Sequence, residues 1–533
     1  MKRLIILLLI TAVFGLFSAG CDMAPVQDRP AIAGAGDAVG DLGAPMTKYK
    51  GGLPYAPKAR YANLTSEYND WKAHYVTSSG TGGYEYRVQR DAASDYDTVS
   101  EGMGYGMLLA VYFNDQITFD LLYAYVKNHF VQSNVPLMHW KVDKNNKNVS
   151  EFNDYAKETK SVTIGVPGKG SATGYTVKPK SVAEVPHDLV YFNKSTGKVF
   201  IFPAKADLDA KNKNLYKTLK ANFDKNTKYY AGCEYARELS SATDADVDMA
   251  AALCFASRKW STSNFWNYTL EADKMLKAIR KNDFSDNFLK NGNLWGDKAC
   301  WNSSYFTPAY YSCVFYPFYK EHTELSAYKT ERDFWRYLSN YIYPEMDKLR
   351  LSSVKGIWPD WCDTSNIDGR VRPSKGSDRH YIINGKNVKQ MSYNFYYDAV
   401  RTPWRLATAN SWLGNPNTTG EHYKQLATAM SFFKEVGIKN VVDGYSRWGG
   451  TWVEAYRDGF NPGQGGVSNS VTFVAMIATL SLPSFDKAWA DECWDWVVYK
   501  KERYTDAHHY YGNTLRLLSL LYLSGQFVNI YQK

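Results

Sequence analysis

The sequence predicts an all-α fold in which pairs of amphipathic helices pack around a common core. The 533 residues are 45% hydrophobic and 22% charged, a composition typical of globular proteins. Apolar residues recur with helical spacing along most of the chain. Beyond the N-terminus no apolar stretch reaches the roughly 18 residues that a bilayer-spanning helix needs, which excludes a multi-span membrane protein. The twelve expected helices span 58–76, 102–113, 116–130, 246–260, 263–280, 307–321, 327–346, 398–412, 421–436, 467–480, 486–501 and 510–525.

The N-terminus carries the pattern of an export signal. A basic start precedes an apolar run over 4–17, and small residues then lead to Cys21. This ending resembles a bacterial lipoprotein processing site, with Ser18 where Leu is usual. We therefore expect a signal peptide over 1–21, a lipid on Cys21 that holds the protein at the bacterial cell envelope, and a flexible tether over 22–48. An ordinary secreted protein is the alternative.

Within the folded domain expected over 49–533, residues 141–230 differ from the rest. This segment contains 17 Lys, no Arg and 9 acidic residues, so it carries +8 of the formal net charge of +9. Strand-like runs at 161–166 and 189–192 predict a partly β, Lys-rich lobe inserted into the helical fold. A nucleic-acid groove needs Arg and interleaved aromatic residues, so we expect no nucleic-acid partner. A solvated insertion and a lobe that docks on an anionic polymer remain the two interpretations.

Six cysteines follow Cys21, an even number that permits disulfides in an exported chain. A chain of this size does not need them for stability, and Cys254 lies in an apolar helical run typical of a buried residue. No Cys or His residues have the spacing of a zinc site. We therefore expect neither a metal nor a cofactor.

Three acidic stretches are candidates for chemistry. In the first, Glu101 precedes glycines at every second position, Gly102, Gly104 and Gly106. These glycines permit close backbone packing or a substrate beside the chain. Glu101 is therefore either a reactive carboxyl or a helix-start acid that interacts with the helix dipole.

The second stretch places Asp244, Asp246 and Asp248 ahead of an apolar helical run. Asp244 and Asp248 are four residues apart and share a helix face, whereas Asp246 points nearly opposite. Two like charges on one face of a buried helix need compensation, which could come from an Arg, a shared proton or ligand hydroxyls. Acids at a helix start explain only one or two of the three.

The third stretch surrounds Asp398 with two tyrosines, a tryptophan and two arginines, Arg401 and Arg405. An i,i+3 contact between Asp398 and Arg401 would hold the acid ionised near neutral pH, which suits a general base. A plain ion pair along a helix is the alternative.

Two carboxyls with opposite protonation states are what hydrolysis of a glycosidic bond requires. The protonated one gives a proton to the leaving oxygen, and the ionised one takes a proton from water. Aromatic residues make up 16% of the chain, and their flat rings stack on sugars as well as filling cores.

Six motifs, in order, resemble the signatures of glycoside hydrolase family 8 in its endoglucanase (cellulase) branch. Ser303 stands where the family has Pro, and Cys254 where an aliphatic residue or Gly is usual. The resemblance implies an (α/α)6 barrel and hydrolysis with inversion at the anomeric carbon. The motifs lie at 100–107, 242–253, 302–311, 359–362, 397–401 and 511–518.

By the same resemblance Glu101 is the general acid, Asp398 the general base, and Asp244 the acidic residue that contacts the sugar next to the scissile bond. Tyr305 and Arg401 would orient the base and its water. A helix N-terminus lowers the pKa of an acid, whereas a nearby ionised Asp244 in a dry cleft would raise it again. We therefore predict that Glu101 and Asp244 lie close together, with the Glu101 and Asp398 carboxyls roughly 6.5–9.5 Å apart.

The expected activity is that of an inverting endo-β-1,4-glucanase acting on cellulose or mixed-linkage β-glucan. Residues 242–246 read Ala-Thr-Asp-Ala-Asp, where the xylan-active branch has Pro-Asp-Gly-Glu-Glu. A xylan-active or oligosaccharide-trimming member of the family and a non-catalytic glycan-binding lipoprotein are the alternatives. We expect a monomer that contacts a membrane only through its lipid, with the insertion at the rim of the cleft. The candidate sugar-binding aromatics, each of which could instead fill the core, are Trp140, Trp295, Trp301, Trp361 and Tyr397.

Overall fold

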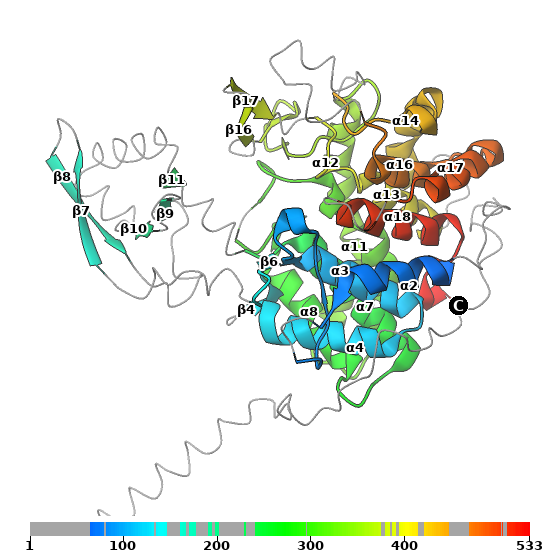
Figure 1. Ribbon diagram of the computed structural model, residues 1–533, viewed down its shortest axis with the longest axis horizontal. Helices are drawn as coiled ribbons and strands as arrows, with labels where there is room; N and C mark the ends of the chain where they lie inside the picture. The colour runs from blue at the N-terminus through cyan, green and yellow to red at the C-terminus, as the bar shows by residue number, and fades with distance from the viewer. Residues whose placement is uncertain are drawn as a thin grey trace, which may run out of the picture.

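The predicted helices are present in the computed structural model of the chain (Figure 1), where each of the twelve segments has a helical counterpart, most of them with shifted boundaries. The signal peptide, lipidation site and tether predicted over 1–48 lie outside the described residues, as does Trp295. The described residues are 64–78, 82–132, 135–146, 160–166, 170–176, 190–193, 198–201, 229–230, 240–294, 296–374, 379–383, 386–390, 394–413, 421–446, 468–502, 504 and 509–532.

Six helical segments of the described chain are buried on nearly all sides. In α18, for example, 13 of the 14 residues are buried, and in α16 all 8 are. Because a helix that is apolar all round must be surrounded by protein, these segments form an inner layer. They are α3 (Ser100–Tyr112), α7 (Thr243–Trp260), α9 (Pro308–Tyr310) with η9 (Tyr311–Phe315) and α10 (Tyr316–Glu321), α13 (Thr402–Leu413), α16 (Val471–Ala478) and α18 (Tyr510–Leu523).

The remaining helices form an outer layer, and most of them bury one face, whereas α4 buries 8 of its 10 residues. The outer helix α17 buries only 5 of its 13 residues. Each outer helix, or helix pair, precedes an inner segment in the chain, so the described helices form six outer–inner pairs, the arrangement of an (α/α)6 barrel. The outer helices are α2 (Leu64–Tyr75), α4 (Gln116–Tyr125) with the π-helical turn η4 (Val126–Phe130), α8 (Tyr268–Asn282), α11 (Tyr328–Tyr337) with α12 (Ser339–Leu351), α14 (Glu421–Val436) and α17 (Lys487–Tyr499).

Side-chain caps fix the starts of several outer helices. The Asn267 side chain accepts the Leu270 N–H at the start of α8, and the Asp486 side chain accepts the Trp489 N–H at the start of α17. The inner helices α3 and α7 lack such caps, since Val99 and Ala242 stand at their cap positions. The first-turn acids Glu101 of α3 and Asp244 of α7 do not occupy the cap positions, so their carboxyls can bind other groups.

Short two-stranded antiparallel sheets lie between the helices. One of them, β3 with β6, joins the residues just before α3 to the start of the insertion. These sheets pair β1 (Val76–Thr77) with β2 (Arg87–Val88), β3 (Thr98–Val99) with β6 (Lys141–Val142), β4 (Val131–Gln132) with β5 (Val135–Met138), β12 (Phe284–Ser285) with β13 (Phe288–Leu289), β14 (Cys362–Asp363) with β15 (Arg372–Pro373), and β16 (Arg379–Ile383) with β17 (Lys386–Gln390).

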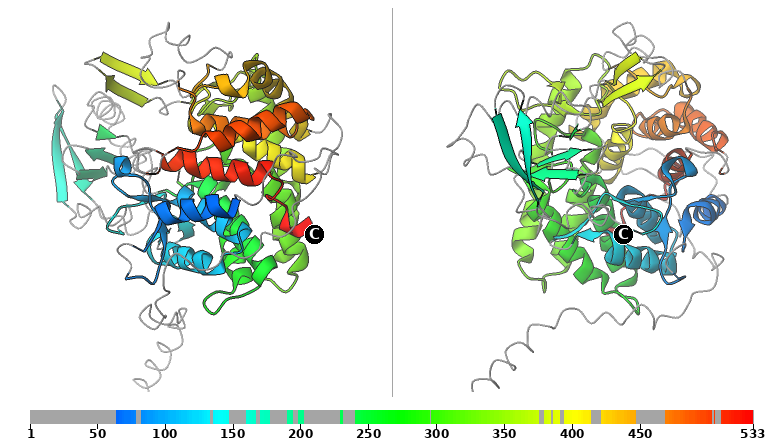
Figure 2. Two further views of the ribbon diagram at one scale, coloured as in Figure 1. Left: turned by 45° about the vertical axis from the view of Figure 1, so that its right-hand side comes forward. Right: turned by 60° about the vertical axis from the view of Figure 1, so that its left-hand side comes forward.

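The predicted insertion contains an antiparallel sheet of five strands in the order β11-β9-β10-β8-β7. The strand-like runs predicted at 161–166 and 189–192 correspond to β7 and β9. Figure 2 shows these strands beside the helical body. The strands are β7 (Lys160–Val166), β8 (Gly170–Thr176), β9 (Val190–Asn193), β10 (Lys198–Ile201) and β11 (Tyr229–Tyr230).

Two further structural findings concern membranes and cysteines. None of the helices in the described ranges is long and apolar enough to cross a bilayer. Cys254 is fully buried, as predicted for a small core residue. Cys233 lies outside the described residues, and no disulfide joins any two of the described cysteines, which are Cys254, Cys300, Cys313, Cys362 and Cys493.

Candidate active site

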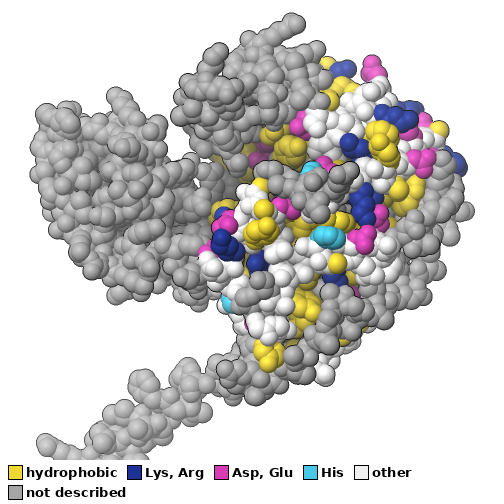
Figure 3. Space-filling model, viewed as in Figure 1, with side chains coloured by type: hydrophobic (Ala, Val, Ile, Leu, Met, Phe, Trp, Pro, Cys, Tyr) yellow, Lys and Arg dark blue, Asp and Glu magenta, His cyan; other side chains and the backbone are white. Residues whose placement is uncertain are grey.

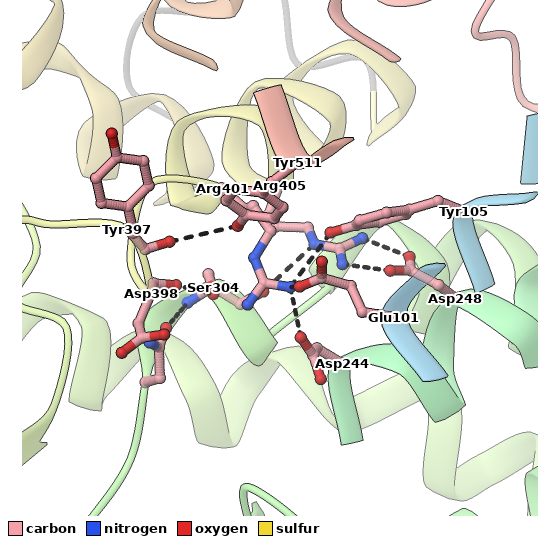
Figure 4. Close-up of polar contacts among 11 residues, drawn as sticks. Glu101, Tyr105, Asp244, Asp248, Ser304, Tyr397, Asp398, Arg401, Arg405 and Tyr511 are labelled. Carbon is pink, nitrogen blue, oxygen red and sulfur yellow. Dashed lines mark hydrogen bonds and ion pairs between the residues drawn. The ribbon is translucent and has the colours of Figure 1, made fainter. Parts of the chain in front are cut away.

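The N-terminal ends of the inner helices bring Glu101, Asp244 and Arg401 together (Figure 4). Glu101 lies in the first turn of α3 and Asp244 in the first turn of α7. Arg401 directly precedes α13, and Tyr511 lies in the first turn of α18. Because these helices are all inner helices, the residues at their starts converge on one end of the barrel axis.

Arg401 is the centre of this cluster. Its Nη1 atom donates hydrogen bonds to Glu101 Oε2 at 2.5 Å and to Asp244 Oδ2, and contacts Tyr105 Oη at 3.2 Å. The Tyr305 ring lies against the same guanidinium, 5.6 Å from its carbon. The predicted proximity of Glu101 and Asp244 is confirmed, since both carboxyls bind one nitrogen.

The cluster keeps Glu101 protonated up to near-neutral pH. Burial raises the pKa of the Glu101 carboxyl to about 7; Arg401 opposes this rise and the charge of Asp244 adds to it. A single guanidinium that faces two carboxyls cannot neutralise both in a poorly solvated site. The favoured state therefore retains one proton, as a general acid requires.

A second ion pair lies one helical turn deeper. Asp248 on α7 accepts two hydrogen bonds from Arg405 on α13, both 2.6 Å long. Asp244 and Asp248 are four residues apart, and so are Arg401 and Arg405, so the two helices match in two successive pairs. This is the compensation that the acidic stretch was expected to need.

Asp398 lies apart from this group (Figure 4) and is held by different contacts. Trp361 donates its indole N–H to Asp398 Oδ2 at 2.7 Å, and Ser304 Oγ donates to the Asp398 backbone carbonyl at 2.8 Å. The predicted helix over 398–412 begins only at Thr402, so Asp398 belongs to the preceding turn. The predicted i,i+3 pair with Arg401 is therefore wrong, because Arg401 turns toward Glu101 instead.

Asp360 anchors the turn that carries Asp398. Its Oδ1 accepts the backbone N–H groups of Tyr396 at 2.9 Å and Ala399 at 2.8 Å, and the residue is 1% exposed. Burial, with the nearby charge of Asp398, raises the pKa of Asp360 well above its usual range. The buried Asp360 carboxyl thus fixes the backbone of the turn that carries Asp398, and the Trp361 indole binds the Asp398 side chain.

The aromatic candidates differ in their exposure and in their contacts. Trp301 is 0% exposed and donates its indole N–H to Thr364, so the prediction that it stacks on a sugar is wrong. Trp361 is 7% exposed and contacts Asp398 directly. Trp140 is partly exposed, and its carbonyl accepts the N–H of Ser100, the residue before Glu101, at 2.9 Å.

Two tyrosines connect the Asp398 turn to neighbouring helices. Tyr397 donates its hydroxyl to Ser470 Oγ at 3.4 Å, and its backbone carbonyl accepts the Tyr511 hydroxyl at 3.3 Å. Tyr305 packs edge-on against Trp361, with ring centroids 5.9 Å apart. Tyr305 therefore lies between Arg401 and the tryptophan that holds Asp398.

Sequence reasoning assigned no role to Tyr105, Asp360 or Arg405, although Tyr105 and Asp360 lie within recognised motifs and Arg405 lies in the third acidic stretch. Two signals could have identified Tyr105 and Arg405. Tyr105 follows Glu101 by four residues and so shares its helix face. Arg405 follows Arg401 by the spacing that separates Asp244 from Asp248.

The structure offers no metal-binding group among the residues it describes: no cluster of three or more His, Cys, Asp or Glu side chains has suitable geometry. The groups that the structure brings to this site are three carboxyls, an arginine and aromatic donors.

Separate carboxyls at one end of a barrel of paired helices are the groups that hydrolysis of a glycosidic bond uses. The chain belongs to glycosyl hydrolases family 8, whose sequence profile matches residues 44–163 and 223–525. Endoglucanase A of Acetivibrio thermocellus is 30% identical over 99% of this chain and 81% of its own length. Endoglucanase 2 of Ruminiclostridium josui is 31% identical over 88% of this chain and 72% of its own length.

Solved structures share the fold. An apo β-1,3-1,4-glucanase from Paenibacillus sp. X4 superposes with a TM-score of 0.57 at 21% identity, covering 91% of this chain and 98% of that one. A cold-adapted family 8 xylanase gives a TM-score of 0.54 at 17% identity, with 88% and 91% covered. At these identities the likeness establishes the (α/α)6 barrel and nothing finer.

Proposed function

We propose that this glycoside hydrolase is an inverting endo-β-1,4-glucanase that cleaves cellulose or mixed-linkage β-glucan, with Glu101 as general acid and Asp398 as general base. The observation that carries the proposal is the different environment of the two carboxyls. Glu101 shares Arg401 with Asp244 and stays protonated to about pH 7, whereas Asp398 accepts from a neutral indole in a separate turn.

The reaction follows from these positions. Glu101 gives its proton to the glycosidic oxygen as the bond from that oxygen to the anomeric carbon breaks. Asp398 takes a proton from a water molecule whose oxygen forms the new bond to the same carbon from the opposite face. A β-linked glucan then yields an α-anomer, the expected stereochemical outcome of a single displacement.

Asp244 is suited to contact the sugar at the cleavage point. Its Oδ2 binds Arg401, while its Oδ1 is buried and has no hydrogen-bond partner among the described residues. A buried unsatisfied oxygen is costly unless a ligand hydroxyl pairs with it. Arg401 and Tyr305 connect this acid to the Asp398 side of the site and would orient the base and its water.

Relatives favour glucan over xylan. The relatives at 30–31% identity are named endoglucanases, whereas the xylanase structures are similar only at the level of the fold. The family match makes the chain an enzyme and so disfavours a non-catalytic glycan-binding lipoprotein. A xylan-active or oligosaccharide-trimming enzyme remains the second candidate, because xylanase structures share the fold.

Hydrolysis assays test the proposal directly. Reducing-sugar release is compared on carboxymethylcellulose, barley β-glucan and xylan, for the wild type and the Glu101→Gln variant. We expect activity on the glucans and a loss of about a hundredfold or more in the variant, the usual contribution of a general acid. Equal rates for the two proteins would remove Glu101 from its role, and activity on xylan alone would reject the glucan assignment. The anomer released first, followed by NMR, should be α; an initial β-anomer would contradict inversion.

The insertion is proposed to rim the substrate cleft. The insertion begins at β6, which pairs with β3, the strand just before Glu101. The chain returns to the barrel at Ser240, whose carbonyl accepts the Trp140 N–H at 3.3 Å. Both ends of the insertion therefore lie next to the acid. Replacing 147–229 by a short linker should change the product lengths from cellohexaose; an unchanged profile would place the lobe away from the cleft.

Export and lipidation are proposed from the sequence pattern of residues 1–21. The proposal predicts that metabolic labelling with palmitate marks the wild-type protein in the bacterial envelope and that Cys21→Ala abolishes the label. Label that persists in the variant would place the lipid elsewhere, and an unlabelled wild type would favour simple secretion. A monomer is expected by light scattering.

A further inference from the structure

The outer helix α17 forms one wall of a hollow whose role the catalytic mechanism does not explain. The hollow has a volume of about 440 Å³, within the range of pockets that hold small ligands. Figure 3 shows acidic, basic and hydrophobic side chains together over the region where Figure 1 draws α17. The residues that line it and enter the argument are Lys439, Asp491, Glu492, Asp495, Trp496 and Tyr499.

An aromatic pair forms the apolar part of this hollow. Trp496 and Tyr499 are one helical turn apart, and their rings stack with centroids 4.8 Å apart at an angle of 28°. Tyr499 is 72% exposed, although α17 already buries its other face in the barrel. The stack fixes the Tyr499 ring, so a ligand that packs on its outer face loses little side-chain entropy on binding.

Charged groups of both signs surround the aromatic pair. Glu492 and Asp495 are exposed on α17, and the Lys439 ammonium lies 3.7 Å from Glu492 and 5.7 Å from the centre of the Trp496 ring. Carboxylates accept and an ammonium donates hydrogen bonds, so together they match the hydroxyl groups of a neutral sugar. The carboxylates do not converge as metal ligands, since no such cluster exists among the described residues.

The hollow is connected to the catalytic end of the barrel. Trp496 donates its indole N–H to Asn469 at 3.1 Å. The next residue, Ser470, accepts the hydroxyl of Tyr397, which directly precedes Asp398 in the chain. The C-terminal turn of α17 and the starts of the inner helices therefore lie at the same end of the molecule, where a long polymer could reach both.

We propose that the hollow around Trp496 and Tyr499 is a second, non-catalytic binding site for a β-glucan chain, outside the cleavage site. A sugar ring would stack on Tyr499 while its hydroxyls bond to Asp495, Glu492 and Lys439. This inference rests on the proposed glucanase activity, because it takes the substrate polymer as the ligand. It predicts tighter binding of polymeric glucan with no contribution to cleavage of short oligosaccharides.

The test measures polymer binding without cleavage. The full chain carrying Glu101→Gln is run by affinity electrophoresis in gels containing barley β-glucan, alone and combined with Tyr499→Ala or Asp495→Asn. We expect Tyr499→Ala to weaken binding about three- to tenfold, the usual contribution of one aromatic contact. A matched control, Tyr337→Ala, removes a tyrosine that is 47% exposed on the outer helix α11 and should leave binding unchanged.

A second measurement separates this site from the catalytic one. In the otherwise wild-type chain, Tyr499→Ala should hydrolyse cellotetraose at the wild-type rate, which also shows that the variant folds, while its KM for barley β-glucan rises. Equal retardation of the Tyr499→Ala and parent chains would overturn the proposed site. If instead the wild type cleaves no β-glucan, the glucanase assignment fails by its own assay.

Discussion

Replacing Asp244 by Asn should move the basic limb of the pH–activity profile to lower pH. In the wild-type site Glu101 and Asp244 share one nitrogen of Arg401. Burial first, and the charge of Asp244 in addition, raises the pKa of Glu101 to about 7, against the opposing effect of Arg401. Asn keeps the shape of the side chain but removes its charge, so Arg401 then acts on Glu101 alone.

The size of the effect follows from the geometry. The Glu101 oxygen lies 2.5 Å from the nitrogen that Asp244 also contacts, so the two carboxyl oxygens are within about 5 Å of each other. Two unit charges at about 5 Å and an effective dielectric constant of about 20 interact by about 3 kcal/mol, equivalent to about two pH units. Arg401 and solvent screen part of this, because the Glu101 side chain is 17% exposed. We therefore expect a displacement of about one pH unit.

The direction is fixed by the role of the proton. Glu101 works in its protonated form, so kcat/KM falls as pH rises through its pKa, and a lower pKa starts this fall at lower pH. The same linkage acts on stability. The folded state binds this proton more tightly than the unfolded chain, so the stabilisation is complete below about pH 4.5 and is lost as pH rises toward about 7. Asp244→Asn lowers the pKa of Glu101 in the folded state and therefore narrows the pH range over which this stabilisation is lost.

The assay is kcat/KM on barley β-glucan across the acid and basic limbs of the profile, for wild type, Asp244→Asn and the control Asp333→Asn. Asp333 lies on the outer helix α11, where its side chain is 52% exposed and bonds Arg332. The control should reproduce the wild-type profile. If kcat/KM of Asp244→Asn falls at the same pH as kcat/KM of the wild type, the charge of Asp244 does not set the pKa of Glu101 and the reasoning is wrong.

Three further perturbations test other contacts of the site. Trp361→Phe removes the indole N–H from Asp398 and should lower kcat about tenfold to a hundredfold with little change in KM, measured by steady-state kinetics. Asp248→Ala leaves Arg405 buried without its partner and should lower the free energy of unfolding by about 3–5 kcal/mol in urea, whereas replacing both by apolar residues should cost less. Gly104→Ala places a Cβ 3.2 Å from both the α7 backbone and Asp248 and should cost about 1–3 kcal/mol in the same assay, while an unchanged midpoint would show that α3 can shift freely.

Helical periodicity and apolar runs predicted helix pairs packed around a common core, and the family resemblance supplied the barrel. Periodicity was not sufficient for the helix start that matters most to function. Asp398 continues the pattern toward α13, but the helix begins at Thr402, immediately before Pro403. Proline favours the first turn of a helix, because its missing N–H is not needed there. Pro403 is thus the signal that places Asp398 in the preceding turn.

Local spacing could predict that Asp244 and Asp248 need counter-charges, but not which residues provide them. Arg401 and Arg405 are 157 residues away from the acids they bind, and Trp361 is 37 residues from Asp398. Contacts of this kind depend on how helices from distant parts of the chain dock. The burial of Trp301 likewise follows from strand β14 and the rings packed against it, which no local pattern records.

The contacts of the two carboxyls appear reversed at first, since the acid binds a cation and the base binds a neutral donor. A cation would normally ionise an acid. Here Arg401 binds both Glu101 and Asp244. Its single positive charge balances one ionised carboxylate, so the other carboxyl keeps its proton. Asp398 needs no cation to be held in place, because Trp361 and the Asp360-anchored turn fix it by hydrogen bonds. The protonation of the acid therefore depends on a charge count that a single substitution at Asp244 changes, whereas the position of the base depends on neutral contacts that the same substitution leaves intact.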